Sequence, residues 1–301
     1  FGSKVLLEGP IVKYKENKVS ASYLFSGKTS YLEQSSKLLY TYINDGKGLP
    51  FNYTDLYGKV SLSSPEGSKI NLFGFKFSDR VSYQGLSQLG WDSYGIGANV
   101  SVVPLGSTVM IKSNFSYSDY KIGLQTLDNL PSKSGIRGYN FGLNFLYFFG
   151  KNQFVWGVET LGFNTDFIYY NSIGRELKQE ENTTELAAFA KYKLNLGSLL
   201  IEPGLRLQYY ASMSEASLEP RLGLKYNATE RLRFKLAAGL YSQNLVAANS
   251  DRDVVNLFYG FLSGDLNLPS SFKGEELRHK LQKSEHLIIG AEVDVTNHID
   301  F

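Results

Sequence analysis

Residues 139–158, YNFGLNFLYFFGKNQFVWGV, decide which fold this chain is expected to adopt. Small or polar residues alternate there with large apolar residues, which are Tyr139, Phe141, Leu143, Phe145, Tyr147, Phe154, Trp156 and Val158. A period of two is typical of a β-strand, so the segment is predicted to form a hairpin that turns at residues 149–152. A soluble sheet with one buried face would alternate in the same way, so the rest of the chain must decide.

The same alternation recurs along most of the 301 residues, which include 29 Gly, 21 Tyr and 20 Phe. It occurs at residues 19–25, 73–77, 96–102, 186–194, 201–209 and 222–226. Thirteen candidate strands can be counted, and most of them have ten or more residues. Strands of soluble sheets usually have about five or six residues, whereas about 9 to 11 cross a bilayer obliquely. Strand length therefore favours a sheet that spans a membrane.

The connections between these strands alternate in length. Tight turns are expected at residues 64–68, 104–107, 149–152, 197–198 and 228–230. Long polar connections are expected between them, at residues 28–52, 80–91, 119–135, 170–182 and 244–284, and only 212–215 breaks the rule by being short. Short turns on one side and long loops on the other are typical of outer-membrane barrels. The sequence thus predicts an all-β fold, an antiparallel transmembrane β-barrel of outer-membrane type.

Each face of this barrel can be assigned from the alternation. Aromatic side chains beside the turn at 149–152 are expected to form part of the girdle at the periplasmic interface: Tyr147, Phe148, Phe149, Phe154 and Trp156. The side chains expected to face lipid are Phe141, Phe145, Leu186, Leu205, Leu222 and Leu236, and those expected to face the lumen are Arg206, Arg221 and Lys225.

Other charged side chains of both signs share the lumen pattern. They are Glu159, Lys191, Lys193, Glu202, Glu219, Arg233, Lys235 and Glu292. Because a barrel interior is polar, the favoured interpretation is that these groups pair across strands, hold water or hydrogen-bond a plug. A substrate role for one of them is the alternative.

The composition argues against several other classes of function. Lys and Arg total 31 against 29 acidic residues, so there is no basic footprint for nucleic acid. Cysteine is absent, and the three histidines, His279, His286 and His298, have no metal-ligand spacing, so neither a metal site nor a cofactor is predicted. No nucleophile stands beside a base, so no catalytic residue and no enzyme activity is predicted. No run of 18 apolar residues encodes a transmembrane helix.

The C-terminal residues bear on whether the chain is complete. Residues 285–295 form the thirteenth candidate strand, 296–298 stand where a short turn is due, and 299–301 would begin a fourteenth. Bacterial barrels usually close with an even number of strands, so the expectation is a chain cut inside the barrel. A complete smaller barrel, ending in the aromatic Phe301, is the alternative.

Several motifs resemble TonB-dependent outer-membrane receptors. The segment LEGPI at residues 7–11 and SGKTSYL at 26–32 resemble the start of their barrel, where EGPI and SGRxSYL are common, with Lys28 in place of arginine. The segments SLEPRLGL at 217–224 and YSQN at 241–244, running into SDRD at 250–253, resemble later parts of it. The resemblance covers nearly all 301 residues.

This resemblance implies a segment of a 22-stranded barrel, residues 1–301, whose plug domain, TonB-interacting box and last strands are not in this chain. Such receptors bind a scarce nutrient at the surface of the bacterial outer membrane and import it when the TonB complex pulls on the plug. The implied partners are outer-membrane lipid, the receptor's own plug domain, the TonB complex through that plug, and in some cases a surface lipoprotein. A passive porin or a structural surface barrel without energy coupling is the alternative.

Ligand binding is expected in the loop at residues 244–284, with 28–52 as its neighbour. Its 41 residues exceed the usual connection, and loops of that length tend to be functional or disordered. We expect Asp251, Arg252 and Asp253 to form a charge network that fixes the loop, and Asn256, Phe258 and Tyr259 to meet the ligand. Iron chelate, vitamin, oligosaccharide and peptide all stay open as the nutrient, and a solvated loop without a contact role is the alternative.

Overall fold

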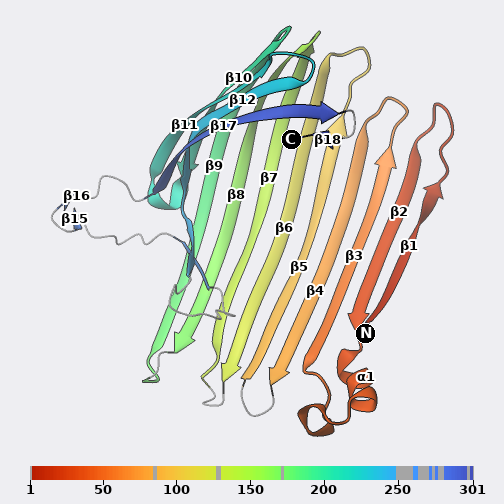
Figure 1. The fold of residues 1–301 in the computed structure, drawn as a ribbon, viewed down its shortest axis with the longest axis vertical. Helices are drawn as coiled ribbons and strands as arrows, with labels where there is room; N and C mark the ends of the chain where they lie inside the picture. Colours follow the sequence, from red (N-terminus) through yellow and green to blue (C-terminus); the bar gives the residue numbers. More distant parts are fainter. Residues whose placement is uncertain are drawn as a thin grey trace.

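The computed structural model describes residues 2–83, 87–126, 130–170, 173–248, 260–263, 271–272, 275–276, 281–296 and 299–300. Fourteen strands form one antiparallel sheet in the order β1 to β12, then β17 and β18 (Figure 1). Among the described residues, no helix is both long and apolar enough to cross a membrane. The predicted antiparallel sheet of long strands is confirmed.

The strands of this sheet follow the chain almost without interruption. They are β1 (Gly2–Val12), β2 (Ser20–Ser30), β3 (Phe51–Ser63), β4 (Lys69–Tyr83), β5 (Ser87–Val102), β6 (Val109–Thr126), β7 (Ser132–Phe149), β8 (Asn152–Tyr170), β9 (Glu176–Leu196), β10 (Leu199–Tyr210), β11 (Glu215–Asn227), β12 (Leu232–Gln243), β17 (Gln282–Thr296) and β18 (Ile299–Asp300). From β1 to β12, and from β17 to β18, each strand pairs with the next one in sequence, so these connections are hairpins. Strand β12 pairs with β17, and a long segment of chain joins them.

Shorter elements lie in the connections. They are α1 (Leu32–Leu39) and the 3₁₀ turn η1 (Ile43–Gly46) after β2, the 3₁₀ turn η2 (Ala211–Met213) after β10, and the small hairpins β13 (Leu245–Ala248) with β14 (Gly260–Ser263) and β15 (Ser271–Phe272) with β16 (Glu275–Glu276) between β12 and β17. In Figure 1, α1 lies at the lower end of the sheet, opposite the short turns at the top.

The short turns lie where the sequence predicts them, and glycine makes the tightest of them possible. Only residues 150–151 separate β7 from β8, and Gly150 has φ 59°. Only residues 197–198 separate β9 from β10, and Gly197 has φ 75°. Two-residue hairpin loops need positive φ, which glycine adopts without a steric cost. The predicted tight turns at this end of the sheet therefore have a local cause in glycine.

The prediction of long connections at residues 80–91, 119–135 and 170–182 is wrong. Strand β4 continues to Tyr83 and β5 begins at Ser87, so that little more than a turn is left there. Similarly, β6 and β7 leave only residues 127–131 between them, and β8 and β9 leave only 171–175. The polar composition was read as loop because the apolar face ends, whereas the backbone ladder continues beyond the height at which lipid requires apolar side chains.

The convex side of the sheet is apolar although it is exposed. The pairing registers put Phe141, Phe145, Leu186, Leu205, Leu222 and Leu236 on this side, together with Leu72, Ile96 and Phe115. Leu72, Ile96 and Leu205 are 53%, 60% and 49% exposed. An apolar surface of this extent is the surface that a barrel presents to lipid tails.

Tightly buried apolar side chains gather toward the ends of the strands away from the short turns. One cluster consists of Val81, Leu89 and Ile122, with Trp91, Tyr120 and Leu124 packed against it. The other consists of Tyr210, Met213 and Leu281. In the middle of the sheet, lipid takes the place that a protein core has in a soluble domain.

Candidate lumenal site

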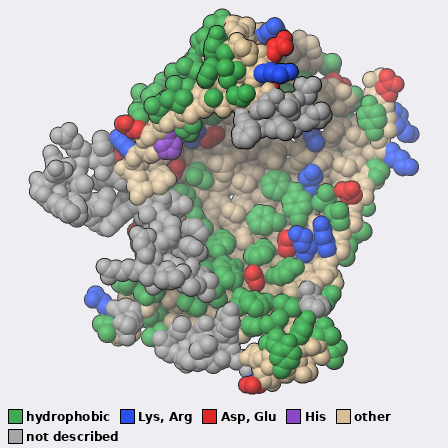
Figure 2. Space-filling model, viewed as in Figure 1, with side chains coloured by type: hydrophobic (Ala, Val, Ile, Leu, Met, Phe, Trp, Pro, Cys, Tyr) green, Lys and Arg blue, Asp and Glu red, His purple; other side chains and the backbone are tan. Residues whose placement is uncertain are grey.

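The concave side of the sheet is hollow and polar. A cavity of about 710 Å³ extends over strands β6 to β12, and Lys112, Asn144, Glu159, Lys191, Arg206 and Arg221 are among the residues that line it. Figure 2 looks into the concave side of the sheet, where charged side chains of both signs are visible. On a barrel of outer-membrane type this is the lumen side, which carries the polar positions of each strand.

Arg206 holds three strands of this wall together. Its Nη1 donates to Glu159 Oε2 at 2.7 Å, and its Nε donates to Gln208 Oε1 at 2.9 Å. The guanidinium lies over the ring of Phe189, 5.9 Å from the centroid, and Phe189 is on β9, the strand between those of Arg206 and Glu159. Gln208 in turn donates to Glu185 Oε2 at 2.8 Å. Arginine suits such a position because its planar fork makes several directed contacts at once.

Two further ion pairs continue this wall. Lys191 Nζ lies 2.9 Å from Glu202 Oε1, and Arg221 Nη2 lies 2.7 Å from Glu219 Oε2. The Arg221 guanidinium also lies 4.6 Å from the centroid of the Tyr241 ring. Cations and carboxylates thus neutralise each other along the cavity, as expected for groups held in a wet interior.

The chain turns into the concave side where β12 ends. Residues 242–244, at this point, are called the loop root. Strands β11 and β12 pair from Asn227 only as far as Arg221 and Gly239. Beyond that point the Ser242 amide and hydroxyl both donate to Glu219 Oε1, at 2.9 and 2.7 Å. Because β12 has parted from β11 there, Ser242 can reach a carboxylate that the regular ladder would place out of range.

Buried polar side chains hold this root. The Tyr210 hydroxyl lies 2.9 Å from Ser242 Oγ, and Tyr210 is only 1% exposed. Asn244 Nδ2 donates to Thr183 Oγ1 on β9 at 3.3 Å, and both residues are buried. Farther along, β14 contacts β7, β8 and β9. The loop root is therefore fixed against the concave wall.

A second cavity, of about 360 Å³, lies beneath this root. Ser116, Ser118, Asn140, Glu185, Gln243 and Asn244 are among its lining residues. Ile136, Leu161 and Phe163 also line it, so it offers amide, hydroxyl and carboxylate groups for hydrogen bonds beside an apolar surface.

The residues proposed from the sequence fall into two groups. Arg206 and Arg221 line the larger cavity. Lys225 shares their face and stands opposite Lys235 in the β11–β12 register, outside that cavity's lining. The six loop residues, Asp251, Arg252, Asp253, Asn256, Phe258 and Tyr259, lie outside the described residues.

The sequence did not single out Glu185, Gln208, Tyr210 or Ser242. The first three share the lumen parity of Arg206 and Lys191, so the alternation alone contains a signal for them. Ser242 has no such signal, because its contact depends on where β12 leaves β11. Within the part of the chain that the structure describes, no group of three or more His, Cys, Asp or Glu side chains is arranged to hold a metal ion.

The chain resembles known proteins in structure, but the sequence comparisons found no relative. No family model matches the chain, and no curated protein matches it. Solved structures do match. A ferric enterobactin receptor (PfeA) mutant from Pseudomonas aeruginosa has a TM-score of 0.62 and 11% identity over 97% of this chain and 48% of that one. The siderophore receptor PirA from Acinetobacter baumannii has a TM-score of 0.63 and 13% identity over 99% of this chain and 48% of that one.

The alcaligin outer-membrane receptor FauA from Bordetella pertussis is similar to the same degree, with a TM-score of 0.62 and 10% identity over 97% of this chain and 46% of that chain. The chain spans about half the length of these structures. At such low identity the likeness establishes the fold. The chain has the fold of an outer-membrane receptor barrel, as the sequence predicts.

Proposed function

We propose that this chain is the central part of the barrel of a TonB-dependent receptor in the bacterial outer membrane, which binds a scarce nutrient and imports it. One observation carries the proposal: the root of the longest connection turns inward and is hydrogen-bonded to the concave wall through Ser242 and Glu219. On this proposal the connection covers the mouth of the barrel, because extracellular loops are where such proteins meet ligands.

A ferric siderophore is the nutrient that we propose. The solved structures of like fold include a ferric enterobactin receptor and siderophore receptors. Many ferric siderophores are anionic, and Lys112 adds a cationic group to a cavity in which Lys191, Arg206 and Arg221 are each paired with a carboxylate. Both arginines stack on aromatic rings, which keeps their guanidinium groups extended along the wall.

The polar groups of the wall also suit contact with a plug domain inside the barrel. Opposed charges and half-exposed carboxylates such as Glu159 and Glu202 offer hydrogen bonds to a domain seated inside the barrel. The plug, the TonB-interacting segment and the remaining strands belong, on this proposal, to the protein outside these residues. The protein acts by transport and catalyses no reaction on its ligand.

Uptake of radioactive iron by cells that depend on the source protein tests this function. We expect uptake of ferric siderophore to require both the source gene and a working TonB complex. Uptake that continues after loss of the TonB complex would favour the passive porin. The control is an established TonB-independent porin substrate, whose entry must stay unchanged.

The intact mass of the source protein separates the same alternatives. A receptor with a plug and a complete barrel should have two to three times the 33.7 kDa of this chain. A native mass near 33.7 kDa would overturn the receptor proposal. The measurement does not depend on knowing the ligand.

A further inference from the structure

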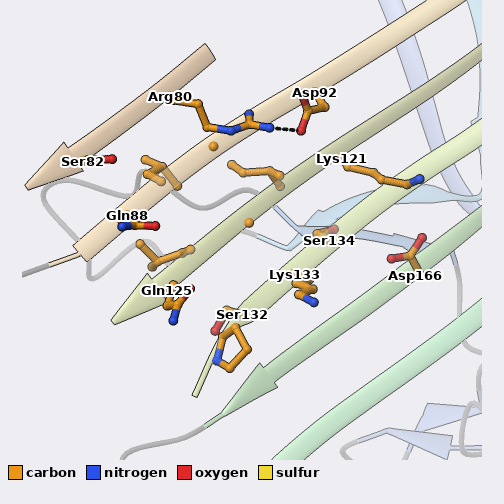
Figure 3. Close-up of a pocket in the computed structure, with 16 residues that line it drawn as sticks. Arg80, Ser82, Gln88, Asp92, Lys121, Gln125, Ser132, Lys133, Ser134 and Asp166 are labelled. Atoms are coloured by element: carbon orange, nitrogen blue, oxygen red, sulfur yellow. Dashed lines mark hydrogen bonds and ion pairs between the residues drawn. The ribbon is translucent and has the colours of Figure 1, made fainter. Parts of the chain in front are cut away.

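A second hollow lies on the convex side of the sheet, outside the barrel. It has a volume of about 460 Å³ and lies at the ends of β4 to β8 that are remote from the short turns. Figure 3 shows its residues: Arg80 is paired with Asp92, and Lys121, Lys133 and Asp166 stand on the strands beside them. The lumenal site does not include this pocket.

The pairing registers place these side chains on the lipid side of the sheet. One row of cross-strand neighbours consists of Ser78, Asp92, Lys121, Gly135 and Asp166. The next row outward consists of Arg80, Gly90, Gly123 and Lys133. Successive residues of a strand alternate between faces, so both rows share the face of Phe115 and Phe141, which lie in the apolar surface.

Glycines make the hollow. A Cβ atom added at Gly123 would meet no atom within 4 Å. At Gly90 and Gly135 the added Cβ would meet the side chains of Arg80 and Asp166, which lie across these glycines. The floor of the pocket is therefore open backbone at Gly123, and the charged side chains of Arg80 and Asp166 cover the backbone at Gly90 and Gly135.

Aromatic side chains mark the height of this pocket relative to the membrane. Tyr94 and Tyr117 lie on the same face, with ring centroids 6.3 Å apart, and Tyr139 is the cross-strand neighbour of Tyr117. Tyrosines at the rim of an apolar band settle at the headgroup level. The pocket begins one row beyond Tyr94 and Asp119, so it lies level with the headgroups of the outer leaflet.

The charge at this level is mixed, with cations in excess. On the convex side of β4 to β8 beyond the apolar band, the cations are Lys76, Arg80, Lys121, Lys133 and Arg137, and the carboxylates are Asp92, Asp119 and Asp166. Arg80 is paired with Asp92 and Lys121 with Asp119, and both cations remain accessible, because their side chains are 49% and 59% exposed. Arginine and lysine around a bare backbone floor suit a phosphate group.

We propose that this pocket binds the phosphorylated headgroup of a glycolipid of the outer leaflet. Lys121, Lys133 and Arg80 contact its phosphate, and the amides of Gln88 and Gln125 on the same rim hydrogen-bond its sugar. The acyl chains then run down the apolar surface that contains Phe115 and Phe141. Continuity between pocket and apolar surface favours a lipid as occupant over a free anion.

Native mass spectrometry of the purified full-length source protein with bisphosphorylated lipid A tests the proposal. We expect Lys121→Gln/Lys133→Gln to weaken retention about thirtyfold, the effect of two cations removed at a membrane surface. Gly123→Leu, which keeps every charge and fills the floor, should also reduce retention. Lys59→Gln, a cation on the concave side, serves as the matched control and should retain lipid as the wild type does.

Two further probes identify the source of the phosphate. Dephosphorylated lipid A should be retained much less than the bisphosphorylated form, and inorganic phosphate should not displace the lipid. Equal retention by wild type and the two pocket variants, or equal retention of the dephosphorylated lipid, would overturn the proposal. Displacement by inorganic phosphate would assign the pocket to a free anion and overturn the lipid. None of these outcomes depends on siderophore uptake.

Discussion

Arg206 and Glu159, which are 47 residues apart in sequence, form a 2.7 Å ion pair that bridges strands β8 and β10 across the intervening β9. Phe189 occupies that intervening strand, and its ring lies beneath the arginine. The contact fixes the relative position of three strands on the lumen side.

A double-mutant cycle measures the energy of this contact. We expect Arg206→Ala and Glu159→Ala to be coupled by about 0.5 to 1 kcal/mol, because both side chains are partly exposed and water screens the pair. The measurement is urea-induced unfolding of the full-length protein in lipid vesicles. The Lys28–Asp55 pair, at 3.6 Å and with both side chains about 40% exposed, is the matched control and should couple less. Equal coupling of the two pairs would contradict the expectation.

Adjacent residues on β11 test the two faces of the sheet. Leu222→Arg should destabilise the barrel by about 2 to 4 kcal/mol at the middle of the bilayer, whereas Gly223→Arg should cost far less. Space supports the second substitution, since the nearest atom to a Cβ at Gly223 is 3.7 Å away. Heat-modifiable migration and urea titration report the difference. If both substitutions were tolerated equally, the assignment of the faces would be wrong.

Tyr210→Phe tests whether the loop root is held by its hydrogen bonds. Removing the hydroxyl keeps the buried ring and breaks the contact with Ser242, which should cost about 1 kcal/mol. Limited proteolysis should then cut more rapidly within residues 244–284, while the barrel stays folded. Tyr209→Phe, on the neighbouring convex position, is the control and should leave the cleavage rate unchanged.

Deletion of residues 251–264 tests the ligand role of the long connection. Ligand binding at the cell surface should be abolished, because Asp251, Arg252, Asp253, Asn256, Phe258 and Tyr259 are removed together. The barrel should remain heat-modifiable, since its strands lie outside the deletion. Unchanged uptake would instead place specificity in the plug or in a surface lipoprotein.

The sequence predicted the strands of the sheet because alternation and tight turns are local properties. Leu205 beside Arg206 and Leu222 beside Arg221 are sufficient to separate two faces without knowledge of the partner strands. The true ends of β4 to β9 were missed because the pattern changes faces there: beyond Asp119 the polar residues lie on the lipid side, while Ile122 and its neighbours Tyr120 and Leu124 form the apolar face on the concave side. Polar composition was taken for loop where it marks only the edge of the lipid.

Side chains that meet through a change in the ladder were also beyond prediction. Ser242 reaches Glu219 only because β12 leaves β11 after Gly239. Phe73 and Phe75 were missed for a different reason: the ladder is regular there, yet these large apolar residues lie on the concave side, opposite Gly97 and Gly95. A Cβ at Gly95 would lie 2.7 Å from the Phe75 ring, so each large residue depends on a small one 20 or more positions away.

The length of β8 and β9 determines how far the sheet extends beyond the membrane. These strands have 19 and 21 residues, about twice the number that a bilayer requires. The additional residues, at about 3.3 Å each, extend the hydrogen-bonded sheet well above the membrane surface. A protease outside the cell would therefore encounter paired backbone before it reached the barrel's entrance, and paired backbone resists cleavage.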